Sequence, residues 1–334
     1  GEGDDVFIFV SEDEFSEDAT VDGGSGTDTI KMSTGSAAVV LENTDFTNVV
    51  GMETLNLAGT GAQSVTLGAD TDSAFASGMT IKTQASAAGL NLQGSASKVA
   101  INATGTNKSD TLIGGAGNDT FIGSAGVDSL FGGSGDDVFM FADILELLDD
   151  SIFNGGDGID TISIDTTGVL LILDSAFFTV SNMENLALTG TGSLTGTGSN
   201  LSPTFVTLGE DSDRAFRTGI TITAQPLASG LDLNAANSKV TVDVIGTNTN
   251  DTLVGGSAAD TLTGGGGSDS LRGGGGNDVF VFSSDSELAA DSRVDGGGGT
   301  DTIKMNSGTT ALTLEDADFT KVIGVETLEL AGTG

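Results

Sequence analysis

Aspartate recurs at every ninth position in two glycine-rich stretches of the chain. Residues 105–140 read GTNKSDTLI, GGAGNDTFI, GSAGVDSLF and GGSGDDVFM, with Asp110, Asp119, Asp128 and Asp137 in sixth place. Residues 246–281 read GTNTNDTLV, GGSAADTLT, GGGGSDSLR and GGGGNDVFV, with Asp251, Asp260, Asp269 and Asp278 in that place. Single copies place Asp28, Asp160 and Asp301 in the same way, and Asp5 ends a truncated copy. Calcium prefers six to eight oxygen ligands, and carboxylates together with carbonyls of a tightly curled backbone can supply them.

The glycines of the repeat are as informative as the aspartates. Glycine tolerates positive φ angles that can aim successive carbonyls at one point, while the apolar residue two places after each aspartate points into a core. The glycines we expect to contribute carbonyl ligands are Gly115, Gly117, Gly133, Gly135, Gly265, Gly267, Gly274 and Gly276. Plain Gly-Asp turns are the alternative, but turn chemistry would accept Asn or Ser where every aligned copy has Asp.

This pattern resembles the GGxGxDxUx nonapeptide of the RTX (repeats-in-toxin) family, a calcium-binding β-helix repeat. The resemblance implies that two nonapeptides form one coil, so that loops 18 residues apart stack on one edge and clasp several ions. The pairs would be Asp110 with Asp128, Asp119 with Asp137, Asp251 with Asp269, and Asp260 with Asp278. GTNKSD, GTNTND and GGSAAD lack part of the glycine set, so the loops ending at Asp110, Asp251 and Asp260 offer a less complete shell.

Carboxylates held close together are unfavourable unless a divalent ion lies between them. Repulsion between negative charges also opposes folding of the chain as a whole, because its 334 residues carry a formal net charge of -37. Metal binding and folding are therefore expected to be one equilibrium, as in other metal-stabilised domains.

The composition also excludes several classes of function. Cysteine and histidine are absent, which rules out disulfides, thiolate sites, histidine-ligated zinc and HExxH proteases. GxSxG is absent too, and although paired carboxylates could hydrolyse glycosides, the aspartates are already explained as ligands. We expect no enzyme. The eleven basic residues are scattered, so nucleic-acid binding is not expected, and the longest aliphatic run, VLLIL at 169, is too short to span a membrane.

Longer internal repeats organise the chain. GDDVFIF at 3 recurs as GDDVFMF at 135 and GNDVFVF at 276, which predicts repeat units 1–134 and 135–275 and a partial unit 276–334. Extra residues near 192–203 indicate a loop insertion in the second unit. Because the chain starts inside a motif, we expect it to be part of a longer polypeptide. Short β-rich groups separated by turn residues favour an all-β fold, a parallel β-solenoid with RTX β-roll segments, over an antiparallel sandwich or barrel.

Two acidic features interrupt this pattern. Fourteen-residue segments begin at 9, 141 and 282, and the pairs Ser11 with Glu14, Asp143 with Glu146, and Ser284 with Glu287 have the spacing of a helix N-terminal box. They predict short surface helices suited to lateral contacts between molecules, or else acidic loops. The groups GADTDSAF at 68–75 and GEDSDRAF at 209–216 favour capped helices ending at Gly78 and Gly219, although calcium binding there stays open.

Tandem units at a regular period favour a structural protein that self-assembles into a surface layer, sheath or filament. The alternatives are the stalk of a calcium-dependent adhesin, or a secretion and folding module of a longer toxin or enzyme. The family resemblance implies export by type I secretion machinery and a place at the extracellular bacterial cell surface. Copies of the same chain are the expected partners.

Overall fold

The computed structural model describes residues 1–17, 20–165, 171–189, 204–224, 230–309 and 311–332. The predicted insertion near 192–203 therefore lies outside the described residues. The chain divides into two compact units. Unit 1 is Gly1–Ile162 with Ser181–Met183, and unit 2 is Ser163–Val180 with Glu184–Gly334. These units differ from the repeat units read from the sequence, whose boundaries stay a prediction.

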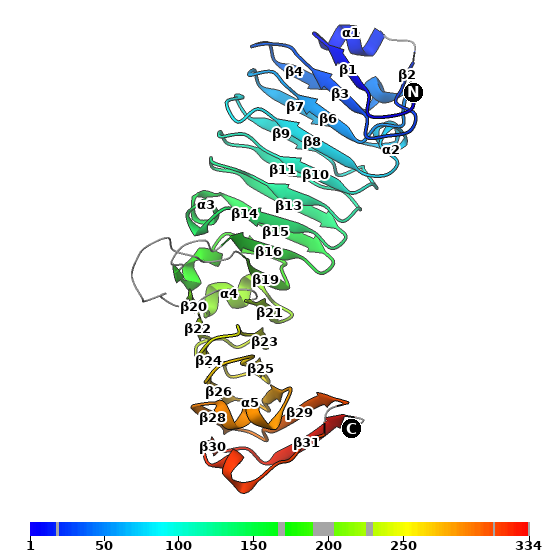
Figure 1. Cartoon of the computed structure of the whole chain (residues 1–334). Coiled ribbons are helices and arrows are strands. Elements are labelled where there is room, and N and C mark those ends of the chain that lie inside the picture. Colours follow the sequence, from blue (N-terminus) through cyan, green and yellow to red (C-terminus); the bar gives the residue numbers. More distant parts are fainter. Residues whose placement is uncertain (18–19, 166–170, 190–203, 225–229, 310, 333–334) are drawn as a thin grey trace, which may run out of the picture. The chain divides into compact units, whose positions relative to one another are not determined.

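Unit 1 is a stack of short strands in two parallel sheets (Figure 1). In spatial order, the first sheet contains β1 (Val6–Phe9), β3 (Thr29–Met32), β6 (Thr54–Leu57), β8 (Met79–Thr83), β10 (Ile101–Thr104), β12 (Thr120–Ile122) and β14 (Val138–Phe141). The second contains β4 (Val39–Leu41), β7 (Gln63–Thr66), β9 (Leu90–Gln93), β11 (Thr111–Ile113), β13 (Ser129–Ser134) and β15 (Ile152–Asp157). A two-stranded sheet pairs β2 (Val21–Asp22) with β5 (Val49–Val50).

Unit 2 repeats this arrangement. Its first sheet contains β19 (Asn185–Thr189), β21 (Ile220–Thr223), β23 (Val242–Ile245), β25 (Thr261–Thr263), β27 (Val279–Phe282), β29 (Thr302–Gly308) and β31 (Thr327–Gly332). Its second contains β17 (Leu171–Ile172), β20 (Thr204–Thr207), β22 (Leu231–Asn234), β24 (Thr252–Val254), β26 (Ser270–Gly275), β28 (Arg293–Gly298) and β30 (Val322–Ile323). Strands β16 (Thr161–Asp165) and β18 (Val180–Ser181) each contain residues of both units.

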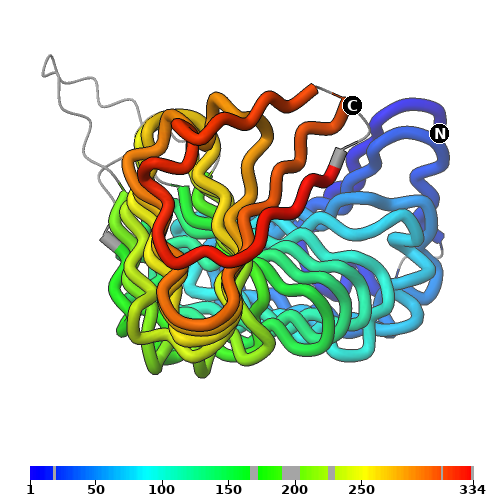
Figure 2. The backbone as a smooth tube through the Cα atoms, turned by 90° about the horizontal axis from the view of Figure 1, so that it is seen from below, coloured from blue at the N-terminus to red at the C-terminus, as the bar shows by residue number. Residues whose placement is uncertain are grey.

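The register confirms the predicted parallel β-solenoid. Successive strands of one sheet belong to successive coils, and Leu112 lies opposite Leu130 in β11 and β13, 18 residues on. Phe121 lies opposite Phe139 in the same way, across β12 and β14. The side chains two places after each repeat aspartate are fully buried in both blocks: Leu112, Phe121, Leu130, Phe139, Leu253, Leu262, Leu271 and Phe280. Figure 2 looks along the coils and shows consecutive turns of the backbone overlying one another within each unit.

Short helices interrupt the coils at the edges. They are α1 (Glu12–Glu17), α2 (Ala69–Ala74), α3 (Ile144–Asp149), α4 (Glu210–Ala215) and α5 (Asp285–Ala290), with 3-10 helices η1 (Asn43–Phe46), η2 (Asp174–Phe177) and η3 (Asp316–Phe319). None of the helices in the described ranges is long and apolar enough to cross a bilayer.

The three acidic interruptions form helices α1, α3 and α5, as the capping pattern predicts. In α3 the backbone N–H of Glu146 donates to Asp143 Oδ1 at 3.1 Å, and the Glu146 carboxylate accepts from the N–H of Ala142 at 2.6 Å. In α5 the N–H of Glu287 donates to the Ser284 hydroxyl at 3.1 Å. Reciprocal bonds of this kind satisfy N–H groups that the first helical turn leaves free, which is why six residues can form a helix here.

Candidate functional site

The repeat aspartates form two columns on opposite edges of each unit. The first column lies before strands of the second sheet and contains Asp110, Asp128 and Asp150 in unit 1, and Asp251, Asp269 and Asp291 in unit 2. The second column lies before strands of the first sheet and contains Asp119, Asp137 and Asp160 in unit 1, and Asp260, Asp278 and Asp301 in unit 2. The parallel register places each carboxylate directly beside that of the next coil.

Backbone hydrogen bonds hold each column together. The N–H of Asp110 donates to Asp128 Oδ1 at 2.7 Å, and the N–H of Asp119 donates to Asp137 Oδ1 at 2.7 Å. The corresponding bonds in unit 2 join Asp251 to Asp269 and Asp260 to Asp278, both at 2.9 Å. The structure thus brings together the four pairs that the family resemblance implies. That these residues ligate calcium stays a prediction.

The second carboxylate oxygen divides the aspartates into two kinds. In Asp110, Asp119, Asp251 and Asp260, Oδ2 accepts an N–H of the residue's own loop at 2.6 to 2.9 Å. In Asp128, Asp137, Asp269 and Asp278, Oδ2 is buried and has no hydrogen-bond partner among the described residues. Leaving a buried polar atom unpaired costs about 1–3 kcal/mol, and more when it is charged. The carboxylate oxygens available to bind a cation therefore lie chiefly at the later coils of each block.

Burial makes the charge on these carboxylates costly. Asp128 and Asp137 are 0% and 1% exposed. Burial, together with the negative charges of neighbouring carboxylates, raises the pKa of Asp128 to about 8 and that of Asp137 to about 7. Burial raises the pKa of Asp119, Asp260, Asp269 and Asp278 to about 6, and it also raises the pKa values of Asp110 and Asp251. A divalent cation would reverse this penalty, because it favours the ionised form.

The loop glycines are required for two different reasons. Gly133, Gly135, Gly265, Gly267, Gly274 and Gly276 have left-handed backbones with φ between +95° and +127°. Gly115 and Gly117 do not, which corrects the expectation that positive φ is the reason for glycine at these two positions. There a Cβ atom would overlap the main chain of the preceding coil, at Ser97 and Val99. The carbonyls of Gly115 and Gly117 in turn lie against Gly133 and Gly135, so that carbonyl oxygens stack coil upon coil.

The column aspartates and the loop glycines together fit calcium, because they offer carboxylate and main-chain carbonyl oxygens. No group of three Asp, Glu, His or Cys side chains in the described part of the chain converges as a ready-made metal cage. Each loop instead offers one carboxylate beside stacked glycine carbonyls, and calcium accepts carboxylate and carbonyl oxygens together. The unpartnered Oδ2 atoms of Asp128, Asp137, Asp269 and Asp278 are the observation that supports this fit.

The single-copy aspartates extend the second-column arrangement. The N–H of Asp5 donates to Asp28 Oδ1 at 2.8 Å, and the N–H of Asp28 donates to Glu53 Oε2 at 2.7 Å. Asp28 is fully buried, whereas the side chain of Asp5 is 44% exposed and lies 3.2 Å from the N-terminal ammonium group. Asp301 likewise donates its N–H to Glu326 at 2.9 Å.

Sequence reasoning missed the residues that end the columns. Glu53 and Glu326 lie in the recurring GMETL and GVETL landmarks, and Asp150 and Asp291 lie within the acidic interruptions. The N–H of Asp128 donates to Asp150 Oδ1 at 2.8 Å, and that of Asp269 donates to Asp291 Oδ1 at 3.0 Å. The signal was present, because Asp150 and Asp291 each precede a serine at the start of a β-rich group, as Asp128 and Asp269 do.

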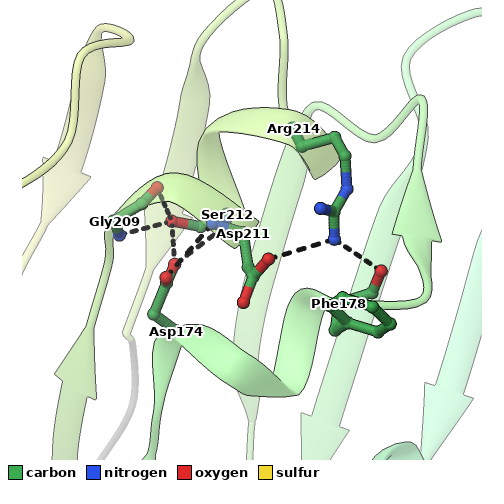
Figure 3. Close-up of polar contacts among 6 residues, drawn as sticks. All are labelled: Asp174, Phe178, Gly209, Asp211, Ser212 and Arg214. Carbon is green, nitrogen blue, oxygen red and sulfur yellow. Dashed lines mark hydrogen bonds and ion pairs between the residues drawn. The ribbon is translucent and has the colours of Figure 1, made fainter.

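The acidic groups at 68–75 and 209–216 form helices α2 and α4, whose last helical residues are Ala74 and Ala215, short of Gly78 and Gly219. Figure 3 shows how α4 is held: Asp174 accepts the N–H groups of Asp211 and Ser212 at 3.1 and 2.8 Å, and Arg214 pairs with Asp211 at 3.1 Å. The guanidinium carbon of Arg214 also lies 5.0 Å from the centre of the Phe178 ring. These carboxylates already have protein partners, which agrees with a capping role.

A model of the RTX calcium-binding nonapeptide repeat, four copies long, matches residues 104–139 and 245–280. These are the two stretches in which the aspartate columns are longest. The comparison with curated proteins found no match for this chain. RTX repeats are calcium-binding motifs and are typical of secreted proteins. The chain is therefore a β-solenoid protein that contains two blocks of RTX calcium-binding nonapeptide repeats.

Proposed function

We propose that the protein is a calcium-stabilised extracellular structural protein whose copies assemble into a surface layer, sheath or filament. The observation that carries the proposal is the set of buried, unpartnered carboxylate oxygens, which recurs in both units at Asp128, Asp137, Asp269 and Asp278. Such a structure is poorly stable without cations and well stabilised with them, because the ion removes the cost of the buried charges.

This dependence suits a protein that is exported unfolded and folds outside the cell. Extracellular calcium modules typically bind with dissociation constants of about 10⁻⁴ to 10⁻³ M, so they stay empty where calcium is scarce. Transport through type I secretion machinery would keep the chain unfolded until it meets calcium. We propose the bacterial cell surface as its final location.

Acidic helices at the edges of the units, with exposed leucines on α3, support a structural role. Helices α1, α3 and α5 recur at equivalent places, each with an acidic first turn. On α3, Leu145 and Leu148 are 64% and 50% exposed beside these acidic groups. Exposed apolar side chains within an acidic surface suit a contact between copies that forms once cations have screened the repulsion.

The stalk of a calcium-dependent adhesin is the second candidate, and a secretion and folding module is the third. Both would use the same calcium-coupled solenoid but would not require contacts between copies. We do not propose catalysis, because every buried aspartate of the columns has a role in ligation or in hydrogen bonding between coils.

Calcium titration with two simultaneous measurements tests the proposal. Far-ultraviolet circular dichroism follows folding, light scattering follows assembly, and excess EGTA then tests reversal. We expect β structure and particle size to rise with calcium and both to fall with EGTA. Folding without an increase in particle size would favour the stalk or the secretion module. Folding that is independent of calcium would overturn all three candidates.

Leu145→Ser with Leu148→Ser tests the contact surface separately. Both side chains are exposed, so we expect the same calcium midpoint for folding as in the wild type and a higher calcium or protein concentration for assembly. Val6→Ser, in which another exposed apolar side chain is replaced at 58% exposure, serves as the matched control. Unchanged assembly of the double variant would exclude α3 as the contact.

A further inference from the structure

A pocket lies between a short helix and a repeat loop on the edge of each unit that carries the first aspartate column. In unit 1 it has a volume of about 430 Å³ and lies between loop residues 124–126 and the side chains of Asp143 and Glu146 at the start of α3. In unit 2 it has a volume of about 650 Å³ and lies between loop residues 265–267 and Glu287 of α5. None of the described residues that line either pocket is basic, so both pockets favour a positively charged side chain as occupant.

Exposed apolar groups adjoin these acids in unit 1. Leu145 lines the pocket there and is 64% exposed, and Leu148 on the same helix is 50% exposed. A lysine suits such a surface, because its aliphatic stem packs against apolar groups while its ammonium group reaches a carboxylate. The volume of about 430 Å³ is sufficient for one lysine side chain.

Lys98 and Lys239 occupy equivalent places on the opposite edge of the two units. They lie in the sequences SASKV and ANSKV, and the interval between them in the chain equals that between Glu146 and Glu287. Lys98 precedes β10 and Lys239 precedes β23, which belong to the first sheets, whereas α3 and α5 precede strands of the second sheets, β15 and β28. Both lysines are exposed, and neither forms an ion pair with another described residue. Each unit therefore has an unpaired lysine on one edge and an acidic pocket on the other.

The main chain at each of these lysines is held by a helix of an earlier coil. Asp72 of α2 accepts the hydroxyl of Ser97 at 2.7 Å through one carboxylate oxygen and the N–H of Lys98 at 3.0 Å through the other. Asp213 of α4 holds the equivalent pair of residues in unit 2 at 2.7 and 2.9 Å. Because the loop is already fixed, a partner that binds the lysine has only its side chain to order.

We propose that the lysine-bearing edge of one copy docks against the helix-bearing edge of a second copy, with Lys98 or Lys239 entering the pocket beside α3 or α5. In a chain with a net charge of -37, this contact brings opposite charges together where most contacts between copies would repel. The two surfaces differ and lie on opposite edges, so the contact is heterologous and leaves each bound copy with a free surface. It therefore extends a row of copies side by side. This inference rests on the proposed self-assembly and names the surfaces that perform it.

Two variants test the two surfaces separately. Lys98→Glu with Lys239→Glu reverses the charge of the lysine-bearing edge, and Leu145→Lys with Ser286→Lys places a positive side chain at each pocket. Leu145 and Ser286 line their pockets and are exposed, so neither change disturbs the interior of the coils. In saturating calcium we expect each variant to assemble only at a protein concentration roughly tenfold higher than the wild type needs, as measured by sedimentation velocity.

Mixing the two variants gives a sharper test, because their intact surfaces complement each other. The lysine variant keeps its pockets and the pocket variant keeps its lysines, so one functional contact can form between them. At a concentration where the wild type assembles and neither variant does, we expect the mixture to form one-to-one dimers and no larger species. A mixture that stays monomeric would overturn the inference.

Lys31→Glu with Lys82→Glu is the matched control. It introduces the same change in net charge as the lysine variant, but these two lysines lie within strands β3 and β8 of the first sheet. We expect this control to assemble at the same concentration as the wild type. Circular dichroism in saturating calcium checks that every variant is folded.

The outcomes separate this inference from the proposed function. If the wild type folds with calcium but does not assemble, the proposed structural role fails and the inference fails with it. If the wild type assembles and the Lys98→Glu, Lys239→Glu variant assembles equally well, only the contact between lysine and pocket is overturned. An equal loss in the Lys31→Glu, Lys82→Glu control would also overturn this contact, because net charge alone would then explain the effect.

Discussion

Replacing Asp128 with asparagine should have opposite effects on stability with and without calcium. In the absence of calcium, Asp128 is a buried carboxylate whose pKa burial raises to about 8. The carboxyl group is therefore mostly protonated in the fold at pH 7, and against an ordinary pKa of 3.8 the uptake of this proton costs the folded state on the order of 4 kcal/mol. Asparagine removes this cost and keeps an oxygen that can accept the N–H of Asp110.

The gain will be smaller than that figure. The asparagine amide places an NH₂ group where Oδ2 has no partner, and a buried unsatisfied group costs about 1–3 kcal/mol. We therefore expect the calcium-free fold of Asp128→Asn to be about 1–3 kcal/mol more stable than that of the wild type. In saturating calcium the order should reverse by up to about 2 kcal/mol, because the variant loses an ion present at one hundred times its dissociation constant, which removes about 3 kcal/mol and outweighs the gain.

Circular dichroism is the appropriate assay, since the chain lacks Trp and Tyr. Urea unfolding in saturating calcium gives one stability, and the concentration of trimethylamine N-oxide needed to fold the calcium-free protein gives the other. Asp149→Asn is the matched control, because Asp149 carries the same charge in an exposed position on α3, and we expect changes within about 0.5 kcal/mol. A change of the same sign in both conditions would refute the electrostatic account of Asp128.

Three further predictions follow from the same geometry. In calcium-free buffer the folded form should be most populated near pH 4 and lost as the pH rises through about 6 to 8, because burial raises the folded-state pKa values of column residues such as Asp137. Circular dichroism across this pH range measures the folded fraction, and a folded fraction that increases towards pH 8 would contradict the prediction. Gly133→Ala should destabilise the calcium-bound protein by more than about 2 kcal/mol, since its Cβ would overlap the Gly115 carbonyl, whereas Gly35→Ala, with φ of +63° and open space around it, should cost only about 1 kcal/mol in urea unfolding. Leu130→Ala should cost about 2–5 kcal/mol in the same experiment because Leu130 is fully buried, and a smaller loss would mean that the coil interior collapses around the cavity.

The sequence by itself determined the coil. The nine-residue step, with Asp in sixth place and an apolar residue two places later, determines where each loop ends and each strand begins. Two such steps give the 18-residue register in which Leu112 lies opposite Leu130. The N-terminal boxes also predicted α3 and α5, because capping depends on residues only three apart. Local spacing was sufficient in these cases since the interacting groups are close in the chain.

Only the tertiary structure decided which carboxylates lack partners. Asp119 and Asp137 occupy the same place in the nonapeptide, yet Asp119 Oδ2 accepts the N–H of Gly115 while Asp137 Oδ2 accepts none. Asp150 joined its column only through the register of β13 with β15, because an interruption containing a helix separates it from Asp128 in the chain. The loops differ in conformation, since Gly133 has a φ of +114° whereas Gly115, at the same place of its nonapeptide, does not have a positive φ. This difference belongs to the folded stack, because the two loops share the same repeat spacing.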